Sequence, residues 1–258
     1  MSRQIVLLHP LGSDKRFWDL VHPDGLPEGY LAVDLPGHGA AAEVDTAELA
    51  DYSAPVVDLL EGLRQDDPHA AVGVVGVSLG GLVAQHVAAR YSGLVDWAAF
   101  VDTVPVYPGP MRQMWRERAA AVAQGAPVGY LDPTLTTWFS DAFCATPRGR
   151  EATDHVRAAL TATRPSAYRT ACEVLERADE TSRLGDVDVP VLVVCGDQDG
   201  AAFQDAMRTF EQTVPVTETA WLEGRHASVI EDNTTFVRLL EEFAERVEPG
   251  ATTAKWRK

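Results

Sequence analysis

Short apolar runs recur along the chain and are separated by longer stretches that mix apolar with charged residues. The runs are rich in Val, Ala and Leu and close on Gly, Pro or Asp, which is typical of parallel strands buried on both faces. This pattern predicts strands over residues 5–9, 30–34, 71–77, 97–102, 191–196 and 216–222.

Between these runs, apolar residues recur at the spacing of one helix face. Leu49, Val56, Leu60 and Leu63 share such a face, and further helical patterns cover 82–90, 202–213 and 234–247. Strands that alternate with helices form a mostly parallel sheet with helices on both sides. We therefore expect an α/β fold with about six strands.

The alternation stops between residues 106 and 186. Four helical patterns follow one another there, with no strand between them, over 111–124, 133–143, 150–163 and 166–179. We expect an inserted helical cap. The predicted division is a core of residues 1–105 and 187–248, a cap of residues 106–186 and a flexible tail of residues 249–258.

The net charge of −16 argues against unassisted binding to nucleic acid or to anionic membranes, which both require clustered Lys and Arg. The cap differs from the rest, with ten Arg, no Lys and ten acidic residues. Those arginines either receive an anionic substrate or pair with acids at helical spacing, and the sequence leaves both readings open.

Three scattered cysteines, Cys144, Cys172 and Cys195, predict free thiols rather than a disulfide framework or a zinc site. The first apolar run is too short for the hydrophobic region of a signal peptide, and no stretch has the length of a bilayer-spanning helix. We therefore expect a cytoplasmic protein with no membrane insertion.

The segment Gly76-Val77-Ser78-Leu79-Gly80 matches the nucleophile-elbow pattern, in which glycines let a strand turn sharply into a helix with a serine at the tip. A buried strand precedes it and a helical pattern follows it, as the pattern requires. The start of that helix favours negative charge beside the serine. Ser78 is therefore the predicted nucleophile, and a purely helix-capping serine is the alternative.

Serine needs a general base, which a third group must orient. His226 follows the last predicted strand and precedes the last helix, where the base is expected in the chain order Ser, acid, His. Gly196-Asp197-Gln198-Asp199 supplies two carboxylates at the carboxyl end of the strand at 191–196, where ligands gather in parallel sheets, and Asp199 is the favoured acid. Asp197 is the second candidate, and Asp102 is a more remote third.

An oxyanion needs two hydrogen-bond donors. The backbone N–H of Leu79 is one candidate, and that of Leu11, in the loop after the first strand, is the other. Pro10 has no N–H and cannot replace Leu11. His9 is expected to shape this loop rather than to act in catalysis.

In these residues the chain resembles the α/β-hydrolase superfamily, and most of all the 3-oxoadipate enol-lactonase family of small bacterial esterases and lactonases. The resemblance covers nearly the whole chain. It is carried by the segments 7–19, 34–39, 76–80, 137–143 and 165–168, together with Val189-Pro190. It implies the α/β-hydrolase fold and hydrolysis of an ester or lactone.

Three departures from that family are visible. In that family a hairpin usually precedes the first strand, whereas this chain starts directly at that strand, so we expect a sheet that is smaller by two strands. Gly200-Ala201-Ala202 replaces a proline-containing loop, and Pro10 replaces a small residue. These departures leave the particular enol-lactone substrate unassigned, so we expect hydrolysis of a small ester or lactone. The alternatives are carbon–carbon bond hydrolysis or other non-esterase chemistry on the same fold, and a non-catalytic binding module.

The resemblance implies no metal or organic cofactor, and the sequence says nothing about the oligomeric state. The cap is expected to supply specificity, although its aromatic residues could equally form its own core. The candidate cap residues for substrate binding are the aromatic Trp115, Trp138, Phe139 and Phe143 and, for a substrate carboxylate, Arg112, Arg116 and Arg169.

Overall fold

The computed structural model describes residues 2–122, 125 and 127–247. It contains six strands, namely β1 (Arg3–Leu8), β2 (Tyr30–Val33), β3 (Ala71–Val77), β4 (Trp97–Val101), β5 (Val191–Gly196) and β6 (Thr217–Leu222). All six form one parallel sheet in the order β2-β1-β3-β4-β5-β6. The predicted six-stranded parallel sheet is therefore confirmed.

The middle of the sheet is the hydrophobic core. Every residue of β3 and β4 is buried, whereas the edge strand β6 keeps five of its six residues only partly buried or exposed. Full burial of a Val or Phe side chain stabilises the fold by roughly 1.5–3 kcal/mol. The central strands are therefore a rigid support for the loops that leave their carboxyl ends.

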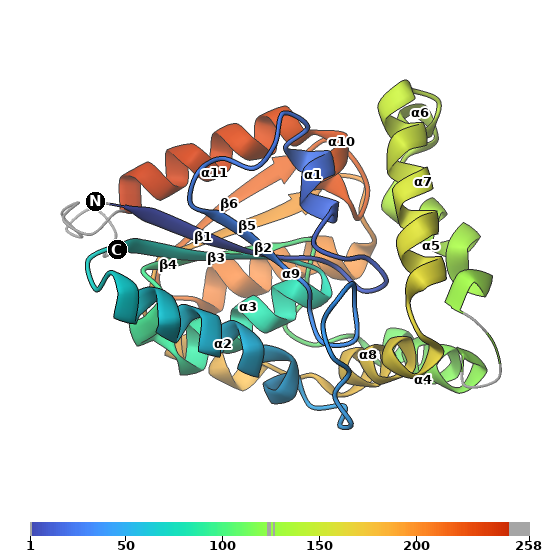
Figure 1. Cartoon of the computed structure of the whole chain (residues 1–258), viewed down its shortest axis with the longest axis horizontal. Helices are drawn as coiled ribbons and strands as arrows, with labels where there is room; N and C mark the ends of the chain where they lie inside the picture. Colours follow the sequence, from blue (N-terminus) through green and yellow to red (C-terminus); the bar gives the residue numbers. More distant parts are fainter. Residues whose placement is uncertain (1, 123–124, 126, 248–258) are drawn as a thin grey trace.

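Helices cover both faces of the sheet (Figure 1). The core helices are α1 (Phe17–Val21), α2 (Leu49–Asp66), α3 (Leu79–Arg90), α9 (Ala201–Thr213), α10 (Ser228–Glu231) and α11 (Asn233–Val247). Helices α1 and α11 lie on one face, and α2 and α3 lie on the other. The short helices α1 and α10 were not predicted.

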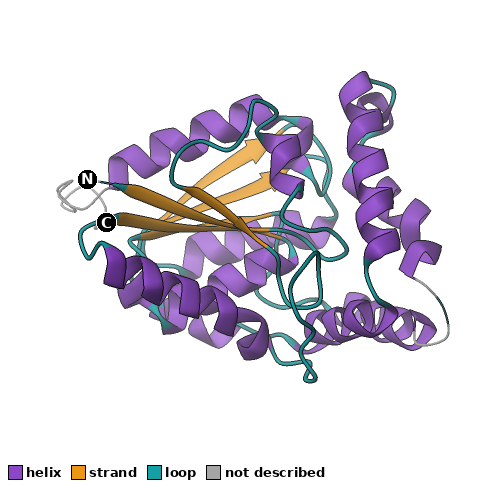
Figure 2. Ribbon diagram, viewed as in Figure 1, coloured by secondary structure: helices purple, strands orange, loops and turns teal. Residues whose placement is uncertain are grey.

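Between β4 and β5 the described residues form helices and no strand, apart from an isolated antiparallel bridge between Val106 and Asp179. The helices are α4 (Gly109–Val122), α5 (Leu131–Trp138), α6 (Asp141–Cys144), α7 (Pro147–Ala162) and α8 (Pro165–Arg177), with 3₁₀ turns around them. Figure 2 shows these helices, called the cap helices below, as a group beyond the ends of the strands. No described helix combines the length and apolar composition needed to cross a membrane.

The single helix predicted over 133–143 is wrong. Phe139 is extended, with φ −126° and ψ 142°, and separates α5 from α6. Ser140 then caps α6 by accepting a hydrogen bond from the Phe143 N–H at 3.2 Å. The last residues of the helix predicted over 111–124, and the tail predicted at 249–258, lie outside the described residues.

The turn from β3 into α3 requires glycine. A Cβ added at Gly76 would overlap the carbonyl of Gly80, whereas one added at Gly62, in the middle of α2, meets open space. We predict that Gly76→Ala lowers the free energy of unfolding by about 1–3 kcal/mol through overpacking. The control Gly62→Ala should raise it by about 0.5–1 kcal/mol because alanine is the better helix former. Urea denaturation measures both, and equal effects of the two variants would contradict this account of the turn.

Candidate active site

Ser78 lies at the tip of the turn between β3 and α3. Its backbone has φ 55° and ψ −111°, a conformation that residues with a Cβ rarely adopt. A hydrogen bond from its N–H to the Val101 carbonyl, at 2.9 Å, ties this strained residue to the neighbouring strand. Such strain persists only where the surrounding structure enforces it, and it is common at functional sites.

The structure brings together the three side chains predicted to act with one another. The Nε2 atom of His226 lies 2.9 Å from the Ser78 hydroxyl, and its Nδ1 atom lies 2.8 Å from Oδ2 of Asp199. Because a carboxylate accepts hydrogen bonds, Nδ1 carries the proton and Nε2 is left to accept the serine proton. The arrangement can therefore remove a proton from Ser78.

Among the three candidate acids, only Asp199 contacts His226 within the described residues. Its second oxygen accepts the N–H of Gly200 at 2.6 Å. Asp197 is exposed, and its carboxylate accepts the N–H of Gly224 at 3.1 Å. Asp199 therefore faces the imidazole, whereas Asp197, two residues earlier in the loop, binds the neighbouring backbone.

Asp102 is fully buried next to this pair. One carboxyl oxygen accepts the N–H of Gly196 at 2.8 Å, and the other accepts the hydroxyl and N–H of Ser228 at 2.7 and 3.2 Å. Burial and the negative charge of Asp199 raise the pKa of Asp102 well above its ordinary range. Asp102 therefore connects the loop that carries the acid to the loop that carries His226.

Asp102, Cys195 and Asp199 lie close enough together to be considered as a metal site. Their donor atoms already serve the protein, since the Asp102 and Asp199 oxygens accept the hydrogen bonds described above. Burial, followed by the nearby carboxylates, also raises the pKa of the Cys195 thiol, which disfavours the thiolate that a metal requires. The donor set does not fit a metal ion.

Electrostatics around His226 favour its charged form. Burial alone would lower its pKa, but the charge and hydrogen bond of Asp199, with a further contribution from Asp102, raise it above the ordinary value of 6.5. The ring of Phe203 packs on the imidazole, with 4.4 Å between the ring centroids. The imidazole is therefore shielded from water on one side and stabilised as a cation on the other.

The two residues predicted to donate to the oxyanion are Leu79, which follows Ser78 in the chain, and Leu11. Leu79 is the first residue of α3, where a helix leaves backbone N–H groups without intrahelical acceptors. Leu11 lines the same cavity as Ser78. A Cβ at Gly80 would lie 2.9 Å from the His9 carbonyl, so this glycine lets the loop after β1 approach the start of α3 closely.

His9 holds that loop in shape. Its Nδ1 donates to the Pro10 carbonyl at 2.8 Å, and its Nε2 accepts the N–H of Leu35 at 3.0 Å. Burial and the neighbouring His38 lower the pKa of His9 to about 3, so that it stays neutral. Both ring nitrogens are thus committed to the backbone on either side of the loop.

The cap helices also hold the loop that carries His226. The N–H groups of His226 and Ala227 donate to the carbonyls of Thr137 and Trp138, at 3.3 and 3.0 Å, at the end of α5. The guanidinium of Arg225 donates to the Phe139 carbonyl at 2.9 Å. Carbonyls left free at a helix end therefore fix the backbone next to the imidazole.

A cavity of about 160 Å³ lies between the core and the cap helices, with Ser78 and His226 in its wall. It is small beside the roughly 300–1,000 Å³ clefts that hold drug-sized ligands. Its other lining residues are Leu11, Met111, Met114, Trp115, Arg118, Thr134, Thr137, Trp138, Tyr168 and Phe203. The walls are mainly apolar and aromatic.

The sequence-predicted binding residues divide in the structure. Trp115 and Trp138 line the cavity, whereas Phe139 and Phe143 do not and pack on each other behind Trp138. The three predicted arginines also lie elsewhere. Arg112 donates to the Glu176 carbonyl, Arg116 pairs with the Glu176 carboxylate, and Arg169 pairs with Glu173.

Seven residues of the cavity wall, and Tyr107 besides, escaped the sequence analysis; the seven are Met111, Met114, Arg118, Thr134, Thr137, Tyr168 and Phe203. Burial raises the pKa of the Tyr107 phenol, and the Ser78 side chain offsets part of that rise. Arg118 could have been found, because it follows Met111 by seven residues and Trp115 by three and so shares their helix face. No local signal marks Phe203 or Tyr107.

Known proteins resemble the chain over nearly its whole length. The 3-oxoadipate enol-lactonase 1 of Acinetobacter baylyi is 25% identical over 249 residues, covering 95% of this chain and 89% of that protein. The pimeloyl-(acyl-carrier protein) methyl ester esterase of Chromobacterium violaceum is 30% identical over 222 residues, covering 83% and 82%.

A similar crystal structure and a family model support the same relationship. The crystal structure of the enol-lactonase from Burkholderia xenovorans matches with a TM-score of 0.85 and 24% identity, covering 95% of this chain and 92% of that one. The model of the alpha/beta hydrolase family matches residues 5–239. The chain therefore belongs to the alpha/beta hydrolase family.

Proposed function

We propose that this alpha/beta hydrolase cleaves small carboxylic esters or lactones through an acyl-enzyme on Ser78. The observation that carries the proposal is the continuous chain of hydrogen bonds from Asp199 through His226 to Ser78, at 2.8 and 2.9 Å, in the wall of an apolar cavity. A serine within hydrogen-bond reach of an imidazole, which a buried acid orients, has the arrangement that nucleophilic acyl transfer requires.

The reaction proceeds in two halves. The Ser78 oxygen attacks the substrate carbonyl while Nε2 of His226 takes the hydroxyl proton, and the N–H groups of Leu79 and Leu11 hold the resulting oxyanion. His226 then gives its proton to the departing alcohol oxygen, which leaves the acyl group on Ser78. Water, deprotonated by His226, attacks the ester so formed and releases the acid and the serine.

The choice of ester or lactone rests on the relatives. Their names describe a lactonase and a methyl ester esterase, and both reactions break an acyl–oxygen bond. The size of the cavity supports a small substrate. A panel of small esters, lactones and vinylogous diketones separates this function from carbon–carbon bond hydrolysis on the same fold.

Ser78 should react with a fluorophosphonate probe, because the probe mimics the acyl group and is trapped at the stage of the tetrahedral intermediate. Ser78→Ala should abolish labelling and lower kcat for any ester substrate by about 10⁴-fold or more. Mass spectrometry of the labelled peptide measures the first effect. A folded wild-type protein that stays unlabelled at Ser78 would contradict the proposal.

Asp199→Asn should lower kcat by about 10⁴-fold, because the amide holds the imidazole in the wrong tautomer. Asp197→Asn is the matched control, two residues away and exposed, and should change kcat by less than about tenfold, because its partner is a backbone N–H and not the imidazole. Steady-state kinetics with one ester substrate measure kcat for both variants. Loss of activity in the Asp197 variant alone would reverse the assignment of the acid.

The dependence of kcat/KM on pH should show an acid limb with a midpoint above 6.5. His226 must be neutral to accept the serine proton, and its pKa is raised, so activity is lost as the pH falls through that raised value. Asp199→Asn should move the limb to lower pH because it removes the main charge that stabilises the imidazolium. A wild-type midpoint below 6.5 would show that the carboxylates do not act on His226 as described.

A further inference from the structure

Four consecutive backbone N–H groups, from Arg225 to Ser228, have fixed acceptors in the loop that carries His226. The two middle groups donate to carbonyls at the end of α5. The N–H of Arg225 donates to Oε1 of Glu231 at 2.7 Å. The N–H of Ser228 donates to Asp102 at 3.2 Å. The backbone on both sides of the imidazole is therefore fixed by a cap helix and by two carboxylates.

The Glu231 side chain binds the cap as well as this loop. Glu231 is the last residue of α10. Both of its oxygens lie 3.1 Å from the backbone nitrogen of Ser140, and one of them also accepts the Ser140 hydroxyl. Ser140 is the residue that caps α6. One carboxylate thus joins the start of a cap helix to Arg225, the residue next to His226.

Three groups donate hydrogen bonds to Glu231, and a carboxylate satisfies all of them. An ionised carboxylate only accepts hydrogen bonds, whereas an amide in its place would turn an NH₂ group toward one of the donors. Among the described residues no cation pairs with Glu231, and the guanidinium of Arg225 donates instead to cap carbonyls. A Cβ on Gly224 would lie 2.9 Å from the Cβ of Glu231, so this glycine allows the loop to approach the acid closely.

We propose that Glu231 is a positioning residue, whose carboxylate joins α6 to Arg225 and so keeps His226 within reach of the Ser78 proton. The inference rests on the proposed function and concerns how the cap controls the base. Glu231 is not among the described residues that line the cavity, so it acts through the loop and not through the substrate. A displacement of the imidazole by about an ångström is enough to slow the reaction about 100-fold.

The first test measures kcat on one ester and the rate of fluorophosphonate labelling in Glu231→Ala and Glu231→Gln. Glu231→Ala should lower both rates, per folded protein, about 10- to 100-fold, because the Arg225 N–H and the start of α6 lose their shared acceptor. Glu231→Gln should restore part of each rate, since the amide oxygen can still accept the Arg225 N–H.

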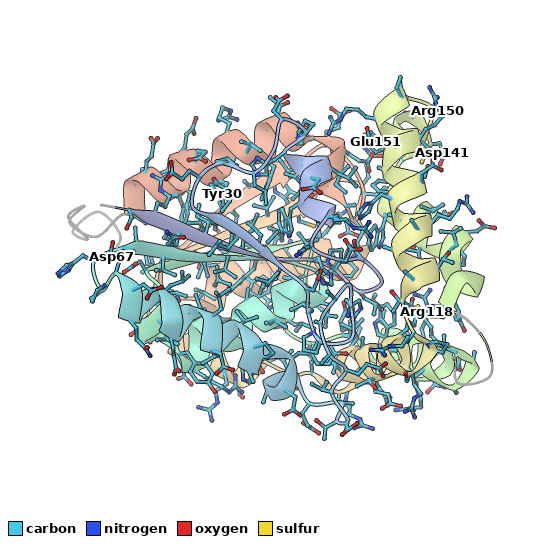
Figure 3. All side chains as sticks on the ribbon, viewed as in Figure 1. Tyr30, Asp67, Arg118, Asp141, Arg150 and Glu151 are labelled. Atoms are coloured by element: carbon cyan, nitrogen blue, oxygen red, sulfur yellow. The ribbon has the colours of Figure 1, made fainter. Side chains whose placement is uncertain are left out.

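Glu151→Ala is the matched control variant. Glu151 is exposed on α7, one of the cap helices (Figure 3), so its removal should leave both rates at the wild-type level. Thermal unfolding shows how much of each variant is folded. If Glu231→Ala lowers the Tm but leaves both rates of the folded protein unchanged, Glu231 has a purely structural role and the proposal is wrong.

A double-mutant cycle tests whether Glu231 acts through the cap. Ser140→Ala removes the hydroxyl that binds Glu231 and should lower kcat about 3- to 10-fold, which corresponds to one hydrogen bond. In the Glu231→Ala background the same change should have a smaller effect, because the two side chains act together. Full effects that multiply, or no effect of Ser140→Ala alone, would contradict the link between the cap and the base.

Proton NMR separates this inference from the proposed function, because it needs no substrate. The Nδ1–H of His226 should exchange with water at least about tenfold faster in Glu231→Ala than in the wild type or Glu151→Ala. An unlabelled wild-type serine together with this faster exchange would refute the hydrolase and keep the positioning role. A labelled wild-type serine, with exchange and labelling rates unchanged by Glu231→Ala, would refute the positioning role and keep the hydrolase.

Discussion

The imidazole of His226, held between the Asp199 carboxylate and the Ser78 hydroxyl, is the interaction on which the proposed site depends. The three residues are far apart in the chain and meet because parallel strands place their carboxyl ends at one edge of the sheet. The fully buried strands β3 and β4 make that edge rigid. A shift of about an ångström there would separate the groups that must exchange a proton.

The two loops beside His226 are tied to their surroundings by several backbone hydrogen bonds. Asp102 links Gly196 to Ser228, and the end of α5 accepts the N–H of His226. The helices that close the cavity therefore also hold the base. The carbonyls that accept these hydrogen bonds are available because α5 ends at Trp138 and Phe139 is extended.

The fold, and the side chains that meet at the proposed site, could be predicted because their signals are local. A buried strand, a glycine-flanked serine and a helix follow one another around Ser78, and His226 follows the last strand. The acid was less certain because Asp197 and Asp199 differ only in how a short turn directs their side chains. The break at Phe139 and the placement of Arg112, Arg116 and Arg169 depend on how the cap helices pack, which no short segment encodes.

Hydrogen bonding at His226 can be observed directly by proton NMR. An Nδ1–H held by a buried carboxylate is strongly deshielded and exchanges slowly with water. The account predicts one such resonance in the wild-type protein, absent from His226→Ala and Asp199→Asn and present in Asp197→Asn. A folded wild-type protein without this resonance, or one that keeps it in Asp199→Asn, would contradict the central arrangement.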